Sequence, residues 1–167
     1  MNKNIFIKDN LIEIRHFLSL KKLLCSSDFP WFYFPHQTSE VLNDSSYFFH
    51  NFYYTKQKNN SNYLNYIEPI IDFLNPHSLI SIRANLIIKR KETNCKYHVD
   101  SLGSKKMSHK TAVFYVNTNN GYTKFKKNNV KVDCIENRIV IFPSNLEHKA
   151  VGQTDQDQRI VININFY

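Results

Sequence analysis

The chain has 167 residues, of which 42% are hydrophobic and 14% aromatic. This length is enough for one domain with a buried core and short for two, so we expect a single domain over residues 1–167. The 22 Lys and Arg against 14 Asp and Glu give a net charge of +8, but the basic residues are scattered and form no basic helix or arm. This pattern argues against a nucleic-acid partner and leaves an acidic or phosphorylated partner as an alternative to compositional bias.

The cysteines and the absence of apolar runs indicate the compartment. Cys25, Cys95 and Cys134 are widely spaced and form no C-x-x-C pair, so neither a disulfide framework nor a zinc knuckle is indicated. Residues 1–10 lack the apolar stretch of a secretion signal, and no apolar run approaches the roughly 18 residues of a membrane span. We therefore expect a cytoplasmic protein with no membrane partner.

Residues 1–78 are expected to support the rest of the fold with two helices and two aromatic strands. Helices are predicted where apolar residues recur every three or four positions, and strands where aromatic residues run without a break. In order, the expected elements are a strand at 5–7, a helix at 11–24 behind the possible cap Asp9, an aromatic strand at 28–35, a loop at 37–45, an aromatic strand at 47–54 and a helix at 61–74.

Residues 79–167 change character and read as a succession of short strands separated by Asn, Gly, Ser or Lys turns. The predicted strands lie at 79–90, 96–100, 111–118, 122–125, 130–133, 138–142, 147–151 and 159–167. Two helices followed by about eight short strands predict a mainly β fold, a double-stranded β-helix (jelly roll, cupin-like) supported by the two N-terminal helices.

Alternation in two of these strands indicates what each sheet face contacts. Because side chains alternate with a period of two, the last strand places one apolar set and one mixed set on opposite faces. The apolar set is Ile160, Ile162, Ile164 and Phe166; the mixed set is Arg159, Val161, Asn163 and Asn165. The 79–90 strand repeats this pattern, with Ser81, Arg83 and Asn85 on its polar side. We expect the apolar faces under the helices and the polar faces around a cavity.

His98 and Asp100 form the central motif, because two positions apart on a strand they point to the same side. An imidazole nitrogen and a carboxylate oxygen can then occupy adjacent positions on one metal ion. A second, distant His completes the 2-His-1-carboxylate facial triad of non-haem Fe(II) oxygenases, which leaves positions open on the metal. His-x-Asp alone is common by chance, so the motif needs support from the rest of the chain.

That support comes from His148, at the start of the predicted strand 147–151, and from Arg159, which heads the final strand. With these residues in this order, the chain resembles the 2-oxoglutarate and Fe(II)-dependent oxygenases of the prolyl-hydroxylase-like branch, and looks like the small members carried by phages and marine bacteria. The setting would be the cytoplasm of a bacterium or of a phage-infected host. The resemblance is best over 82–167, where it includes the strands 114–117 and 137–142 and the turn 120–125.

The resemblance implies that His98, Asp100 and His148 bind Fe(II), and that Arg159 pairs with the C5 carboxylate of 2-oxoglutarate. The implied reaction consumes O2 and 2-oxoglutarate, hydroxylates an unidentified small molecule or peptidyl residue, and gives succinate and CO2. Tyr115 occupies the Tyr position of the prolyl-hydroxylase Tyr-Leu-Asn strand and is expected to hydrogen-bond the co-substrate. Asn85 is expected to reach its C1 carboxylate.

Several residues restrict the reaction that the resemblance implies, and the role of Arg83 is undecided. No second Arg follows Arg159, which argues against base demethylation, and Asp100 argues against halogenation, which needs the carboxylate position free. Arg83 either binds substrate or pairs with an acid such as Glu136. The remaining histidines are expected to be surface or core residues: His16, His36, His50, His77 and His109.

Two other functions remain as alternatives: a catalytically silent jelly roll that binds a ligand or partner, and a cupin-like metal enzyme that does not use 2-oxoglutarate. A buried cation at Arg159 is required only by the 2-oxoglutarate reading. The sequence leaves the substrate and the oligomeric state open. Specificity is expected from the segments at the cavity mouth, 30–55, 89–94 and 101–110.

Overall fold

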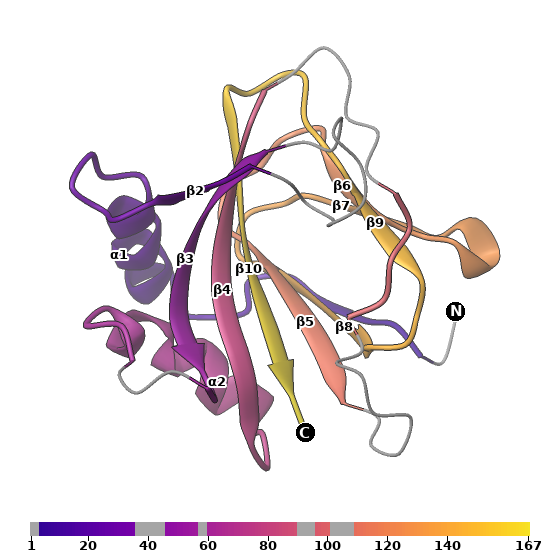
Figure 1. Ribbon diagram of the computed structural model, residues 1–167, viewed down its shortest axis with the longest axis horizontal. Helices are drawn as coiled ribbons and strands as arrows, with labels where there is room; N and C mark the ends of the chain where they lie inside the picture. The colour runs from indigo at the N-terminus through magenta and orange to yellow at the C-terminus, as the bar shows by residue number, and fades with distance from the viewer. Residues whose placement is uncertain (1–3, 36–45, 57–59, 90–95, 101–108) are drawn as a thin grey trace.

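A computed structural model of the chain describes residues 4–35, 46–56, 60–89, 96–100 and 109–167. The described residues form two antiparallel sheets that face each other, with helices on the outer side of the larger one (Figure 1). This arrangement confirms the predicted mainly β jelly roll with supporting helices. The predicted loop at 37–45 and most of the segment 101–110 lie outside the described residues.

Most element boundaries lie within two residues of the predicted ones. The helical elements are α1 (Ile14–Leu24), η1 (Leu64–Ile67), α2 (Glu68–Leu74) and η2 (Lys127–Asn129). The strands are β1 (Phe6–Lys8), β2 (Phe32–Phe34), β3 (Tyr47–Tyr54), β4 (Leu79–Ile88), β5 (Lys110–Tyr115), β6 (Tyr122–Phe125), β7 (Lys131–Asp133), β8 (Arg138–Pro143), β9 (His148–Val151) and β10 (Gln158–Phe166).

The sheet order places the last strand at the centre of the molecule. The larger sheet runs β1-β8-β5-β10-β4-β3-β2 and the smaller one β7-β6-β9. Strand β10 pairs with β4 on one side, with Val161 opposite Asn85 and Asn163 opposite Arg83, and with β5 on the other. Since directly paired residues share a sheet face, this register aligns the polar side chains of both strands on the inner face.

The outer face of the larger sheet carries the main core. Ile160, Ile162 and Ile164 are fully buried there, together with Phe17 and Leu20 of α1. Burying one such side chain stabilises the fold by about 1.5–3 kcal/mol, so this layer holds β10 and β4 rigidly behind the cavity. The alternation predicted for the last strand is therefore confirmed.

Three local predictions differ from the structure. Asp9 does not cap α1, which begins at Ile14; its carboxylate instead accepts a hydrogen bond of 2.9 Å from Nη2 of Arg138. The predicted second helix is divided: the 3₁₀ turn η1 comes first and α2 follows. A proline lies in the first turn of α2, where backbone N–H groups have no partner within the helix, so its missing N–H breaks no hydrogen bond. Residues 96–100 form only an isolated bridge between His98 and His148, in place of the predicted strand.

One buried side chain, Asn137, ties the N-terminal segment to the sheet. Its backbone is left-handed (φ 57°), and its side-chain amide bonds Ile12 twice: Oδ1 accepts from the Ile12 N–H at 3.1 Å, and Nδ2 donates to the Ile12 carbonyl at 2.9 Å. The Asn137 carbonyl also accepts from the N–H of Leu11. This residue fixes the entry of the chain into α1.

We expect Asn137→Ala to lower the free energy of unfolding by about 2–4 kcal/mol, because two buried backbone groups lose their partners and alanine disfavours positive φ. Chemical denaturation measures this loss. Asn129→Ala is the matched control, since Asn129 also has a positive φ (52°) but is exposed. Equal losses in both variants would show that backbone conformation alone matters and would contradict the role given to the amide bonds.

Among the described helices, none is long and apolar enough to cross a membrane.

Candidate active site

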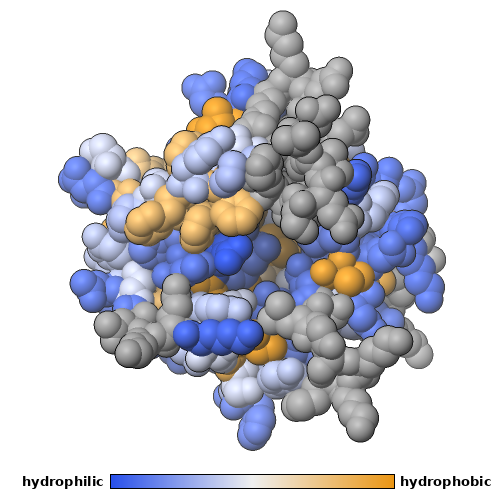
Figure 2. All heavy atoms as spheres, in the orientation of Figure 1, coloured by the Kyte–Doolittle hydropathy of each residue, from blue (hydrophilic) through white to orange (hydrophobic). Residues whose placement is uncertain are grey.

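A cavity of about 740 Å³ opens between the two sheets. Figure 2 shows hydrophilic side chains gathered in the hollow on this side of the molecule. The inner faces of β4 and β10 supply its back wall, and His98, Asp100 and His148 lie on its other side. The residues that line it include Tyr47, Asn51, Lys56, Arg83, Asn85, Lys96, His98, Asp100, Val113, Thr123, His148, Arg159, Val161 and Asn163.

Three potential metal ligands converge in this cavity. One ligand atom from each of His98, Asp100 and His148 lies within 4.8 Å of the others. Nε2 of His98 is 3.7 Å from one Asp100 oxygen, and Nε2 of His148 is 3.6 Å from the other. Among the described residues this is the one group of three His, Cys, Asp or Glu with such spacing. Two imidazoles and one carboxylate on one side suit Fe(II) with open positions.

Backbone pairing holds these residues although no regular strand contains His98. The N–H of His98 donates to the carbonyl of His148, and the N–H of His148 donates back, both at 2.9 Å. The N–H of Asp100 donates to the carbonyl of Ser144 at 2.9 Å. The sequence segment 96–100 is thus clamped to the start of β9, which explains how residues 50 positions apart share one site.

The imidazole of His148 is oriented for metal binding. Its Nδ1 donates to the Leu146 carbonyl at 2.9 Å, so Nε2 carries the lone pair toward Asp100. Phe142 packs edge-on to the ring at 4.7 Å between centroids. Burial lowers the pKa of His148, and the neutral ring that results is the form that binds a metal.

Arg159 is a buried cation with unsatisfied donors. The residue is 1% exposed, and its Nε and Nη1 have no hydrogen-bond partner in the described part of the chain. A buried guanidinium without an acid is costly, so these donors require an anionic ligand. Gly121 leaves space for the Arg159 side chain, because a Cβ on Gly121 would lie 3.1 Å from Cδ of Arg159 and 2.9 Å from the carbonyl oxygen of Val151.

Tyr115 does not line the cavity directly. It is fully buried, and its hydroxyl donates to Oγ1 of Thr123 at 2.8 Å; burial raises the pKa of Tyr115 to about 12, so it stays protonated. The Thr123 hydroxyl lines the cavity, and because it accepts from Tyr115, its own proton is available to a ligand. Sequence reasoning missed Thr123, although strand alternation puts it on the same face of β6 as the buried Phe125.

Asn85 and Arg83 both lie on the inner face of β4. The Oδ1 atom of Asn85 is buried and has no partner among the described residues. Arg83 donates from Nε to Oδ1 of Asn51 at 2.9 Å. Glu136 instead pairs with Lys21 of α1 at 2.6 Å, so the alternative ion pair between Arg83 and Glu136 is wrong.

The other described histidines join no metal-binding group. His50 is buried and bonded at both ring nitrogens, to the Pro30 carbonyl and to Ser61, so its role is structural. His36 lies outside the described residues.

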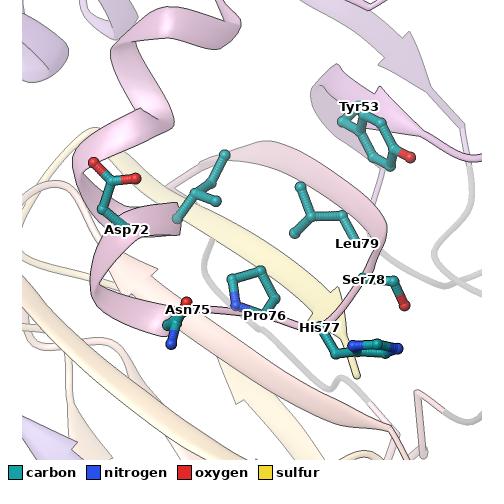
Figure 3. Close-up of a pocket in the computed structure, with 8 residues that line it drawn as sticks. Tyr53, Asp72, Asn75, Pro76, His77, Ser78 and Leu79 are labelled. Carbon is teal, nitrogen blue, oxygen red and sulfur yellow. The ribbon is translucent and has the colours of Figure 1, made fainter.

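A second pocket, of about 610 Å³, lies at the C-terminal end of α2, where Asp72, Asn75, Pro76 and His77 line it (Figure 3). It brings together no metal-binding set and no buried unpaired cation among the described residues.

No protein-family model matches the sequence, and no curated protein matches it. Solved structures do match over nearly the whole chain. A prolyl hydroxylase from Trichoplax adhaerens, solved with a hypoxia-inducible-factor peptide, has a TM-score of 0.70 at 12% identity over 99% of this chain and 84% of that one. An oxidoreductase of the 2OG-Fe(II) oxygenase family from Burkholderia pseudomallei has a TM-score of 0.72 at 8% identity, covering 99% and 86%.

A third similar structure is SnoN, an alpha-ketoglutarate-dependent epimerase of nogalamycin biosynthesis, with a TM-score of 0.69 at 10% identity over 98% of this chain and 77% of that one. Identities this low establish a shared fold. The jelly roll is thus the one found in prolyl hydroxylases and other 2-oxoglutarate oxygenases, and the activity has to be argued from the site.

Proposed function

We propose that the protein is an Fe(II)- and 2-oxoglutarate-dependent dioxygenase that hydroxylates a substrate and releases succinate and CO2. The observation that carries the proposal is the buried guanidinium of Arg159, whose unpaired donors lie in the same cavity as His98, Asp100 and His148. A metal site and a buried anion site in one cavity match a co-substrate that binds metal at one end and carries a carboxylate at the other.

Each residue then has a defined task. His98, Asp100 and His148 hold Fe(II) and leave its other positions open, while Arg159 binds the C5 carboxylate of 2-oxoglutarate. Thr123, which accepts a hydrogen bond from Tyr115, donates to the same carboxylate, and the amide of Asn85, whose Oδ1 has no partner among the described residues, binds the C1 carboxylate. When bound, Fe(II) would activate O2, which is the oxidant: one oxygen atom would enter succinate as 2-oxoglutarate loses CO2, and the other would enter a substrate C–H bond.

The apolar part of the cavity wall protects this chemistry. Val113 and Val161 are buried and line the cavity, and Val161 stands two residues after Arg159 on the inner face of β10. The Val161 side chain helps to exclude water from the guanidinium, which strengthens its pairing with a carboxylate.

Two alternatives fit the same geometry less well. A silent binding protein has no need for a metal triad facing a buried Arg, and a cupin-like enzyme would hold its metal with more histidines than the two found here. The similar structures include an epimerase and a carbocyclase, so hydroxylation is the narrower part of the proposal. It rests on Asp100, whose carboxylate keeps the position that halogenation would need.

The proposal is tested by adding Fe(II) and then 2-oxoglutarate under anaerobic conditions. We expect a visible metal-to-ligand charge-transfer band only when both are present, because the band requires the keto acid on the metal. Succinate in place of 2-oxoglutarate is the control, since it lacks the keto group and should give no band. A folded, Fe(II)-loaded sample that shows no band with 2-oxoglutarate would overturn the proposal.

A further inference from the structure

Resting on the proposed function, we infer that the substrate carries an oxyanion group, a carboxylate or a phosphate, and that Arg83 binds it. Arg83 lines the same cavity as the metal-binding set, two residues before Asn85 on β4. The proposed co-substrate site does not use it. The inference therefore concerns the substrate end of the cavity.

The contacts of Arg83 leave its charge without a counterion. Nε donates to Oδ1 of Asn51 at 2.9 Å, Nη1 lies 3.5 Å from the Tyr47 hydroxyl, and the guanidinium lies over the Phe49 ring at 5.1 Å. All three partners are neutral, and within the described ranges no carboxylate forms an ion pair with Arg83. These contacts fix the plane of the guanidinium while its positive charge stays available to a ligand.

The charges around the cavity also favour an anionic substrate. Once loaded, the co-substrate site is neutral, because an Fe(II) dication, the Asp100 carboxylate, dianionic 2-oxoglutarate and the Arg159 guanidinium cancel. Asp100 is the one acidic residue among the described lining residues. Arg83, Lys56 and Lys96 are the cations that remain. In a partly enclosed space this surplus favours an anionic ligand.

A polar row on the inner face supports Arg83. The sheet register pairs Arg83 with Asn51 on β3 and with Asn163 on β10, so the three side chains lie side by side. Oδ1 of Asn163 is buried and has no partner in the described part of the chain. Rotating this amide by half a turn presents its N–H groups instead, and these can donate to an oxyanion held by Arg83.

Aromatic rings continue from this row to the edge of the sheet. Phe49, on which Arg83 stacks, contacts Phe32 and Phe34 of β2 at 6.0 and 5.9 Å between centroids. Phe32 and Phe34 are 56% and 40% exposed. An oxyanion bound at Arg83 would therefore have an apolar surface beside it, which suits an acid carrying a ring or another apolar group.

The inference is tested with phenyl phosphate and benzoate as probes. The protein is loaded with Zn(II) and 2-oxoglutarate, which fill the co-substrate site without turnover, and each probe is titrated by calorimetry. We expect the wild type to bind at least one probe and Arg83→Gln to weaken that binding at least tenfold. The probe that binds more tightly identifies the oxyanion as a phosphate or a carboxylate.

Arg15→Gln is the matched control, because Arg15 is an exposed arginine that pairs with Glu13 and does not line the cavity, and this variant should bind both probes as the wild type does. If Arg83→Gln does not fold, Asn51→Ala replaces it, since losing the bond to Nε should weaken probe binding severalfold. Binding unchanged in these variants, or no binding of either probe by the wild type, would overturn the inference. A purely structural Arg83 would lower the melting temperature and leave probe binding intact.

Binding of 2-oxoglutarate to each Zn(II)-loaded variant is measured separately. If 2-oxoglutarate binds but the probes do not, the inference of an anionic substrate is refuted and the proposed function stands. Failure of the wild type to bind 2-oxoglutarate would refute the proposed function itself.

Discussion

Replacing Arg159 with alanine is expected to abolish 2-oxoglutarate turnover and to leave Fe(II) binding close to that of the wild type. The guanidinium is buried, its Nε and Nη1 have no protein partner among the described residues, and Arg159 is not a member of the metal-binding set. Removing one member of a buried charge pair costs about 2–5 kcal/mol, which corresponds to a loss of 2-oxoglutarate affinity of roughly 30-fold to several thousandfold.

Anaerobic calorimetry with Fe(II) measures the metal affinity, the charge-transfer band on later addition of 2-oxoglutarate measures the co-substrate affinity, and succinate formed in air measures turnover. Arg159→Lys should be intermediate, since it keeps the charge but loses the two-pronged geometry. Arg138→Gln is the matched control: Arg138 pairs with Asp9 near the N-terminus and does not line the cavity. An Arg159→Ala variant with wild-type affinity for 2-oxoglutarate would remove the main support for the proposed function.

The periodicity of apolar residues predicted the strands and helices, because it reflects which side chains are buried. The alternation of Ile and Asn in 159–167 identified the two faces of β10, and the structure buries the first set and turns the second toward the cavity. The helical spacing in 11–24 likewise predicted α1, although Ile14 and Leu18, which belong to that spacing, are exposed, and the residues buried against the sheet are Phe17, Leu20 and Leu24. These signals repeat along the chain, so no single residue decides them.

Single-residue predictions failed where a distant partner decides the outcome. Asp9 looked like a helix cap, but Arg138, 129 positions away, takes its carboxylate. Lys21 likewise takes Glu136, which had been considered for Arg83. A local sequence pattern cannot predict ion pairs between residues that lie far apart in the chain.

The site was partly visible in the sequence for a related reason. His98 and Asp100 are neighbours, so their shared direction could be argued locally, although the segment forms only a bridge to His148. Thr123 and Gly121 were not singled out, because their roles depend on Tyr115 and Arg159, which the sheets bring to them. Arg159 itself could be predicted as inward-facing, but only the fold shows that no acid among the described residues accompanies it.

Asp100→Asn is expected to weaken Fe(II) binding at least about a hundredfold while leaving the metal-free protein as stable as the wild type. The side chain is 16% exposed, and its two oxygens lie 3.7 and 3.6 Å from the two imidazoles, so the amide loses the negative charge that the metal needs without changing the size of the residue. Losing one partner of a buried charge pair costs about 3–5 kcal/mol, which sets the expected loss.

The metal-free protein should tolerate the change because Oδ2 of Asp100 has no hydrogen-bond partner among the described residues, so asparagine removes a buried charge without breaking a bond. Anaerobic Fe(II) titration and thermal melting of the apo form measure the two effects. Glu147→Gln is the control, since Glu147 precedes His148 but pairs with exposed Lys126. Unchanged Fe(II) affinity in Asp100→Asn would exclude Asp100 as a ligand, whereas a lower apo melting temperature would assign it a structural role.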